Sequence, residues 1–184
     1  MAVVSVGLKY KARPAILYMM FGYPGAGKTT TARIISQLTG AVRLSSDQYR
    51  AEKYTTPTFT PKEHDEVYRD LDTMCRQLLS QGKDVIYDAN LNRRIHRQEK
   101  YEICQQTNAK PKLLWVQTPK EIAKTRATEN GEIDPHRPFG NLDVAVFDRL
   151  AQEIETPTED ESYIVVDGTK ITTEYIRTLL QLQS

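Results

Sequence analysis

One stretch, Gly22 to Thr29, constrains the fold of this chain more than any other segment. It reads GYPGAGKT and matches the pattern G-x-x-x-x-G-K-[ST]. Glycines in such a loop let successive backbone N–H groups converge on a phosphate chain, and the helix that follows adds the positive end of its dipole. The motif works only between a strand and a helix, so it predicts both flanking elements.

Both flanks have the expected sequence. Before the loop, residues 15–21 (AILYMMF) are almost continuously apolar, as in a strand that is buried on both faces. After the loop, apolar residues recur at helical spacing between 32 and 38, and Gly40 is placed to end the helix. The stretch therefore predicts a strand, a phosphate-binding loop and a helix in succession.

The loop also predicts which cofactors are bound and by which residues. Lys28 can reach the β- and γ-phosphates of a nucleoside triphosphate, and the Thr29 hydroxyl can bind Mg²⁺. ATP and Mg²⁺ are therefore the expected cofactors. The residues expected to contact the nucleotide here are Gly22, Tyr23, Pro24, Gly25, Ala26, Gly27, Lys28, Thr29 and Thr30.

Strand and helix patterns alternate along the rest of the chain. Short apolar runs predict further strands at 41–44, 83–88, 113–116 and 163–168. Helical periodicity predicts helices at 60–82, 92–107, 120–128, 142–154 and 172–182, with Thr60 and Asn92 as N-caps. This alternation predicts an α/β fold of the three-layer P-loop NTPase type. It has a parallel five-stranded sheet with helices on both faces, and a lid segment.

Length and composition limit the number of domains, the kinds of partner and the expected cellular location. The 184 residues predict a single domain, and a net charge of +1 gives no bulk attraction to nucleic acid or to membranes. Residues 1–13 are expected to form an N-terminal extension whose apolar run is too short for a signal peptide. Cys75 and Cys104 follow no metal-ligand spacing and are expected to lie in helices as small apolar residues. We expect a cytoplasmic protein with no membrane segment and no obligate protein partner.

A phosphoryl group held by the loop could be transferred to water or to a second substrate, and a nearby base would decide between them. Asp47 is the candidate base, because it follows the second predicted strand at its carboxyl end, where ligands bind in open α/β sheets. Arg50 could hold a phosphate on the acceptor side. The alternative interpretation is that Asp47 caps a helix that carries Arg50.

Two polar residues follow the third predicted strand. Asp88 is placed like an aspartate that holds a metal-bound water or Thr29, and Asn90 shares its position at the strand end. Asp88 and Thr29 are therefore the expected metal-binding residues. A simple strand-end turn is the alternative interpretation for Asp88 and Asn90.

Basic residues form two further groups. Arg93, Arg97 and Lys100 recur at i, i+4 and i+7, which indicates either a solvated helix face or a track for a phosphorylated substrate. Arg126 and Arg137 flank or lie within a segment without periodicity, which predicts a lid over about 126–140. Arginines there could close over the charge that develops during phosphoryl transfer, or could be ordinary surface residues.

These motifs resemble a known family. The segments GYPGAGKTT, LSSDQYR, VIYDANLNRR and PTEDESYIVVDG are similar to those of small P-loop kinases related to polynucleotide 5′-hydroxyl kinase. Zeta-toxin-like and chloramphenicol phosphotransferase-like enzymes are neighbours of that group. The resemblance extends from about Ile16 to Gly168. It implies an ATP- and Mg²⁺-dependent kinase whose acceptor is a hydroxyl, on a nucleic acid 5′ end or on a small molecule.

The resemblance also implies roles for individual residues. Asp47 would be the general base, and Arg50 would contact an acceptor phosphate. Arg126 would clamp the donor phosphates with Lys28. The family commonly has a second lid arginine three or four residues later, where this chain has Glu129 and Asn130, so Arg137 is its candidate replacement. The expected catalytic residues are Lys28, Asp47 and Arg126, and the expected substrate-binding residues are Asp47, Arg50, Asp88, Asn90 and Arg93.

Two other functions fit the same residues. A nucleotide-dependent ATPase switch or binding module would hydrolyse ATP slowly and would need no acceptor base. A zeta-toxin-like sugar-nucleotide kinase would share the chemistry and differ only in its acceptor. Replacing Asp47 with asparagine separates a kinase from a switch, because only the kinase depends on that carboxylate.

Overall fold

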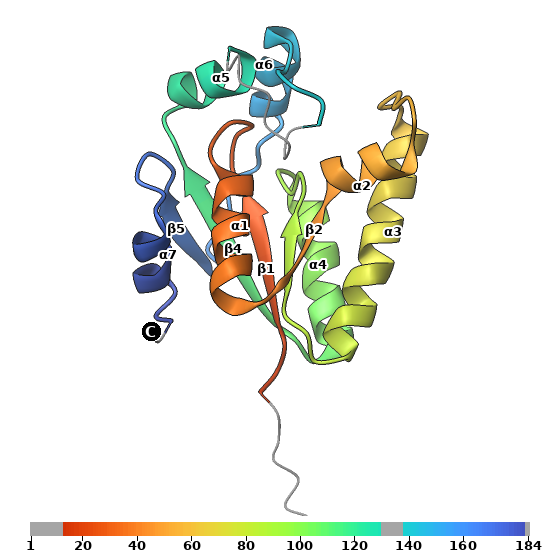
Figure 1. The fold of residues 1–184 in the computed structure, drawn as a ribbon, viewed down its shortest axis with the longest axis vertical. Coiled ribbons are helices and arrows are strands. Elements are labelled where there is room, and N and C mark those ends of the chain that lie inside the picture. Colours follow the sequence, from red (N-terminus) through yellow and green to blue (C-terminus); the bar gives the residue numbers. More distant parts are fainter. Residues whose placement is uncertain (1–12, 130–137, 183–184) are drawn as a thin grey trace, which may run out of the picture.

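The computed structural model describes residues 13–129 and 138–182. In them, parallel strands form one sheet with the order β2-β3-β1-β4-β5 (Figure 1). This arrangement confirms the predicted α/β P-loop fold. Most of the predicted N-terminal extension, Arg137 and the centre of the predicted lid lie outside the described residues. The strands are β1 (Ile16–Phe21), β2 (Val42–Ser45), β3 (Val85–Asp88), β4 (Lys110–Gln117) and β5 (Tyr163–Asp167).

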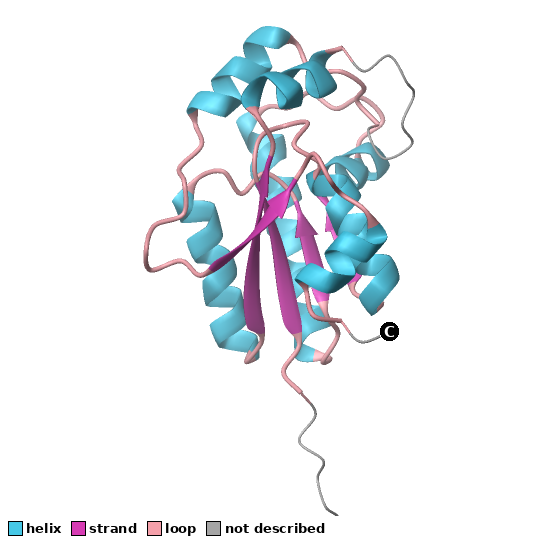
Figure 2. Ribbon diagram, turned by 90° about the vertical axis from the view of Figure 1, so that its left-hand side faces the viewer, coloured by secondary structure: helices cyan, strands magenta, loops and turns pink. Residues whose placement is uncertain are grey.

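Helices lie on both sides of this sheet (Figure 2). α3 and α4 cover one face, and α1 and α7 cover the other. No helix within the described ranges is both long and apolar enough to cross a membrane. The helices are α1 (Lys28–Thr39), α2 (Ser46–Lys53), α3 (Pro61–Ser80), α4 (Arg94–Thr107), α5 (Lys120–Thr128), α6 (Val144–Gln152) and α7 (Thr173–Leu179).

The central strand β1 explains why its sequence is apolar without alternation. Leu17, Met19 and Phe21 pack into the core under α3 and α4. Tyr18 and Met20 pack into the opposite core under α1 and α7. Because successive side chains of a strand point to opposite faces, a strand covered on both sides must be apolar at every position.

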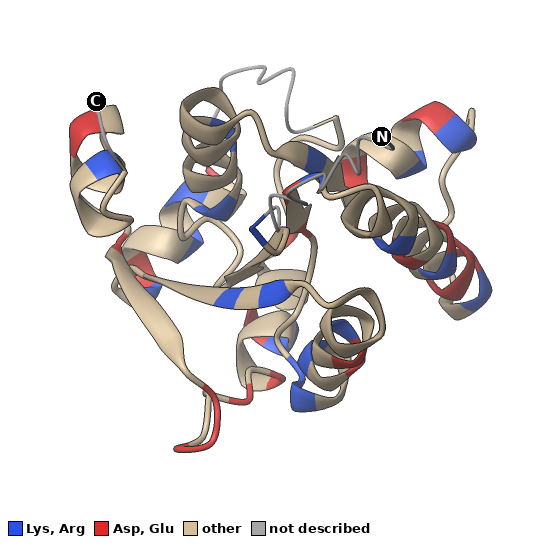
Figure 3. Cartoon of the chain, turned by 90° about the horizontal axis from the view of Figure 1, so that it is seen from below, with Lys and Arg blue, Asp and Glu red and all other residues tan. Residues whose placement is uncertain are grey.

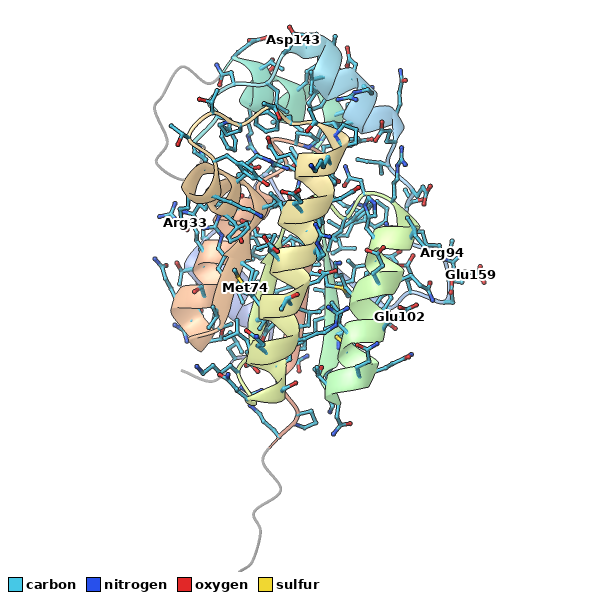
Figure 4. All side chains as sticks on the ribbon, turned by 90° about the vertical axis from the view of Figure 1, so that its right-hand side faces the viewer. Arg33, Met74, Arg94, Glu102, Asp143 and Glu159 are labelled. Atoms are coloured by element: carbon cyan, nitrogen blue, oxygen red, sulfur yellow. The ribbon has the colours of Figure 1, made fainter. Side chains whose placement is uncertain are left out.

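Parallel strands end at the same edge of the sheet, and this edge carries the candidate site. The phosphate loop follows β1 there, and α2 follows β2. Figure 1 shows α5 and α6 beyond this edge, above the loop. Asp143, which caps α6, is labelled at this end of the molecule in Figure 4.

Neither Asp47 nor Asn92 caps a helix. Residues 46–53 form the helix α2, and its N-cap is Ser45, whose side chain accepts a hydrogen bond from the Gln48 N–H. The capping interpretation of Asp47 is therefore wrong. Asn92 does not cap α4 either, because the N-cap position is Arg93. Instead, Glu155 from a distant part of the chain accepts the Arg94 N–H at 2.6 Å.

The basic stripe on α4 also needs correction. Arg97 and Lys100 are fully buried. Arg97 donates to both carboxylate oxygens of Glu161, at 2.7 and 2.8 Å, and Lys100 donates to Asp72 at 2.7 Å. These two residues are therefore neither a solvated face nor a track for a substrate. Charges of both signs are interspersed over the helices in general (Figure 3).

The two cysteines lie where they were expected. Cys75 is buried in α3 and Cys104 is buried in α4. Burial raises the pKa of each thiol to about 12. Both side chains therefore act as small apolar residues of the core.

Candidate functional site

The phosphate loop is pressed against its surroundings at two glycines. Gly22 and Gly25 have φ values of 140° and 74°. A Cβ atom at Gly22 would overlap the carbonyl oxygen of Val116 in β4, and one at Gly25 would overlap the carbonyl oxygen of Ala123 in α5. Both the backbone conformation and the lack of space therefore require glycine here.

Residues after β4 and β5 fix the loop from the side. The buried Thr118 hydroxyl donates to the carbonyl oxygen of Ala26 at 2.8 Å. Arg126 on α5 donates to the carbonyl oxygen of Gly168 at 2.9 Å. Gly168 is packed so tightly that a Cβ atom there would overlap both Thr118 and Ala26. The structure thus places the predicted arginine Arg126 beside the phosphate loop.

Lys28 is folded against the loop that carries it. Its ammonium group donates to the carbonyl oxygens of Gly22 and Tyr23, each at 2.8 Å. Burial lowers the pKa of Lys28 to about 8, although the carboxylates of Asp88 and Asp47 act in the opposite direction. A bound phosphate would add negative charge and favour the protonated ammonium group.

Asp88 joins the loop to β2. Its Oδ1 lies 3.3 Å from the Thr29 hydroxyl, which donates to it. Its Oδ2 lies 2.8 Å from both Nε and Nη2 of Arg43. Arg43 also donates to Gln48 on α2 at 2.9 Å. Sequence reasoning missed Arg43, and the signal that could have found it was a charged residue inside a short apolar strand.

Thr29 and Asp88 suit a Mg²⁺ ion. Hydroxyl and carboxylate oxygens are the hard ligands that Mg²⁺ prefers. The two side chains are already in contact at the start of α1. Arg43 binds Oδ2 of Asp88, so Oδ1, which faces Thr29, is the carboxylate oxygen that could bind the ion.

Asp47 lies in the first turn of α2, and its side chain is 58% exposed. Desolvation of the carboxylate and repulsion from Asp88 raise the pKa of Asp47. The cations Arg50, Lys28 and Arg43 act to lower that pKa. The structure therefore brings the predicted base into the electrostatic field of the phosphate loop.

Arg50 is part of a buried network. Its side chain is 5% exposed, and its Nε donates to Glu63 at 2.8 Å. Glu63 also accepts hydrogen bonds from the backbone and the hydroxyl of Thr58, at 2.7 and 2.8 Å. One guanidinium nitrogen of Arg50 lies 3.9 Å from the Asp47 carboxylate. Arg50 is therefore fixed beside Asp47.

Asn90 is held by an aromatic residue that the sequence did not indicate. The Asn90 N–H donates to the Tyr68 hydroxyl at 2.9 Å, and this hydroxyl lies 3.4 Å from the Asn90 carbonyl oxygen. The Asn90 side chain accepts the Asn92 N–H at 3.0 Å, which makes a strand-end turn. Tyr68 stacks on His64 at 4.2 Å and faces His96 at 6.3 Å. Desolvation lowers the pKa of both histidines.

Arg93 forms an ion pair with the C-terminal end of α6. Its side chain is half-exposed and lies 3.5 Å from Glu153, the residue that ends α6. The structure therefore brings together Lys28, Thr29, Asp47, Arg50 and Asp88, with Arg43 as an addition, while Arg93 makes a separate contact.

The fold and the loop define a class of protein, and comparison with known families gives the family. A model of an AAA domain (AAA_33) matches residues 17–157. The match covers well over half of the chain, so the protein belongs to this AAA-domain family. No curated protein matches the chain.

Solved structures with the same fold include several kinases. A sugar kinase from Janibacter sp. HTCC2649 is 19% identical, with a TM-score of 0.65 over 92% of this chain and 94% of its own. The APS kinase of Mycobacterium tuberculosis, in complex with AMPPNP and APS, is 15% identical, with a TM-score of 0.65 over 92% and 97%. A chain of the Pnkp1/Rnl/Hen1 RNA repair complex is 18% identical, with a TM-score of 0.62 over 79% and 45%. The protein thus has a P-loop kinase-like fold.

Proposed function

We propose that this protein is an ATP- and Mg²⁺-dependent kinase that transfers the γ-phosphoryl group to an acceptor hydroxyl. The observation that carries the proposal is the position of Asp47 in the first turn of α2, at the sheet edge where Asp88 meets Thr29, with a guanidinium nitrogen of Arg50 3.9 Å from its carboxylate. A switch that only binds or slowly hydrolyses a nucleotide needs no carboxylate at that place.

The phosphate loop would bind the donor. Backbone N–H groups of residues 25–30 would surround the β- and γ-phosphates, while Lys28 and Arg126 would stabilise the charge that develops on them. Thr29 and Asp88 would hold Mg²⁺, which supplies further charge neutralisation when bound. A sugar kinase and an APS kinase in complex with AMPPNP share this fold, which supports the assignment.

Asp47 would act as the general base. Its carboxylate would accept the proton of the acceptor hydroxyl while the hydroxyl oxygen bonds to the γ-phosphorus. The bond from that phosphorus to the bridging oxygen would break, and ADP would leave with the electron pair. A raised pKa makes this carboxylate a better proton acceptor.

The acceptor would lie on the α2 and α3 side of the loop. Arg50 is fixed beside Asp47, and Asn90 is fixed by Tyr68, so both could contact the acceptor. Arg93 is a third candidate at the start of α4. The acceptor hydroxyl would belong to a small molecule or to a nucleic acid 5′ end, and the structural neighbours include an APS kinase and a chain of an RNA repair complex.

Transfer of labelled phosphate from ATP tests the proposal. The purified chain with Mg²⁺ is expected to label at least one acceptor among 5′-hydroxyl oligonucleotides, nucleosides and amino sugars. Asp47→Asn should lower the transfer rate by about 100-fold or more while ATP binding is retained.

The control is Glu52→Gln, which changes an exposed carboxylate on the same helix. It should keep the full rate. Equal transfer by Asp47→Asn and Glu52→Gln would exclude Asp47 as the base. ATP hydrolysis without labelling of any acceptor would favour the nucleotide-dependent switch.

A further inference from the structure

Phe59, in the loop between α2 and α3, is unusual in two ways. Its φ of 54° lies in the left-handed region, which disfavours bulky residues. Its side chain is also 54% exposed, although it is a large apolar ring. Strained residues persist where their surroundings hold them, and they are concentrated at ligand-binding sites. The conformation of Phe59 thus calls for a reason beyond core packing.

Two side chains hold the ring in place. The Arg50 guanidinium carbon lies 4.9 Å from the centre of the Phe59 ring. Phe139, which comes shortly before α6, meets Phe59 edge to face, with ring centres 4.9 Å apart and planes at 84°. Because Arg50 is itself fixed by Glu63, the ring rests on a rigid support. Phe59 is therefore a fixed aromatic surface that remains half-exposed.

This surface is close to the candidate base. Arg50 contacts Phe59 through its guanidinium group, and a nitrogen of the same group lies 3.9 Å from the Asp47 carboxylate. The Arg50 side chain thus lies between the Phe59 ring and the Asp47 carboxylate. A molecule whose hydroxyl reaches Asp47 would lie within reach of Phe59.

We propose that Phe59 and Phe139 determine acceptor specificity by stacking a planar aromatic ring of the acceptor. The inference rests on the proposed function and deepens it. The favoured acceptor carries its hydroxyl near such a ring, as a nucleoside does, and a plain sugar or polyol is disfavoured. Stacking on an aromatic side chain accepts any planar ring, because the contact is made by the π face. The Arg50 guanidinium group also holds the Phe59 ring through a cation–π contact.

Steady-state kinetics with three acceptors test this role. The probes are adenosine, ribose as the same sugar without the ring, and 2-phenylethanol as an aromatic alcohol that is not a nucleoside. Wild type should prefer the ring-bearing acceptors. Phe59→Ala should raise the KM for them by about tenfold, with kcat changed by less than about twofold. Phe59→Trp should restore the wild-type KM, and labelling of adenosine or 2-phenylethanol shows which source of ring is used.

Tyr163→Ala is the matched control. Tyr163 is 43% exposed and also forms an edge-to-face pair, with Trp115 at 5.3 Å, but it lies at the start of β5. The Tyr163→Ala substitution should leave the KM values for all three acceptors unchanged. If Phe59→Ala does not fold, Phe139→Ala provides the same comparison, with a KM increase of about threefold expected from loss of the supporting ring.

Two results would overturn the inference. One is a wild type that phosphorylates ribose as well as it phosphorylates adenosine and 2-phenylethanol. The other is a set of Phe59 and Phe139 variants that lower transfer to all acceptors equally, in step with a lower Tm. In both cases the kinase itself remains active, whereas the absence of any labelled acceptor would contradict the proposed function.

Discussion

Close packing and hydrogen bonds to backbone carbonyl groups hold the phosphate loop, whereas ion pairs between side chains hold the residues around Asp47. Carbonyl oxygens of β4 and α5 lie where Cβ atoms at Gly22 and Gly25 would be, so the loop has no room for side chains there. On the acceptor side, Arg50 and Glu63 form a buried ion pair between α2 and α3. The donor side thus depends on shape and the acceptor side depends on charge.

This difference explains how one fold can serve many acceptors. A loop packed this closely against its neighbours tolerates almost no substitution at Gly22 and Gly25. A network of side chains can be replaced one pair at a time without disturbing the sheet. Solved structures with this fold include a sugar kinase, an APS kinase and a shikimate kinase.

The largest effect is expected from removing one partner of the buried pair. Glu63→Ala leaves the guanidinium of Arg50 buried without its carboxylate, and this should lower the free energy of unfolding by about 3–5 kcal/mol. Asp70→Ala is the control, because it removes a partly exposed carboxylate that pairs with Lys53 and accepts from the Tyr49 hydroxyl, and should cost only about 1–2 kcal/mol. Urea unfolding measures both. Equal losses would show that the acceptor side does not depend on buried charge.

A smaller effect is expected at the phosphate loop. Gly25→Ala would displace the loop from α5, so the affinity for ATP should fall by at least about 100-fold. Gly82→Ala is the control, because Gly82 has nearly the same φ, 76° against 74°, and nothing within 4 Å of the added Cβ. It should cost only about 1 kcal/mol of stability and leave binding unchanged. Calorimetric titration with ATP measures the affinity, and similar affinities for the two variants would show that contact with α5 is unimportant.

The smallest effect concerns the charge of Lys28. Burial lowers its pKa to about 8, so the free protein loses the ammonium group as the pH rises through 8. Because the phosphates bind the protonated form, ATP affinity should fall by up to about tenfold per pH unit above pH 8. Lys28→Arg keeps its charge up to about pH 12 and should remove this pH dependence, whatever its absolute affinity. An equally steep decline in the arginine variant would assign the titration to another group.

The sequence predicted the donor side because that side is local. Gly22 to Thr29 are contiguous, and the strand before them and the helix after them have clear periodicity. The parallel sheet followed from the alternation of such patterns. The position of Asp88 beside Thr29 also followed, because both lie where strands end at the same edge.

Ion pairs between distant residues were harder to predict, both beside the site and in the core. Arg43 meets Asp88, 45 positions away, and Arg97 meets Glu161, 64 positions away. Helical spacing made Arg97 resemble a surface residue, since the pattern shows which side chains share a face but not what covers that face. The strained backbone at Phe59 leaves no compositional signal at all.

The two buried cysteines have a practical consequence for labelling. They are the only cysteines in the sequence, and both thiols lie in the core with pKa values raised to about 12. Thiol reagents attack the thiolate, so neither side chain should react in the folded protein at neutral pH. A cysteine introduced at an exposed position on α2, such as Glu52→Cys, would then carry a fluorophore alone. The native chain therefore already provides the unreactive background that single-site fluorescence measurements require.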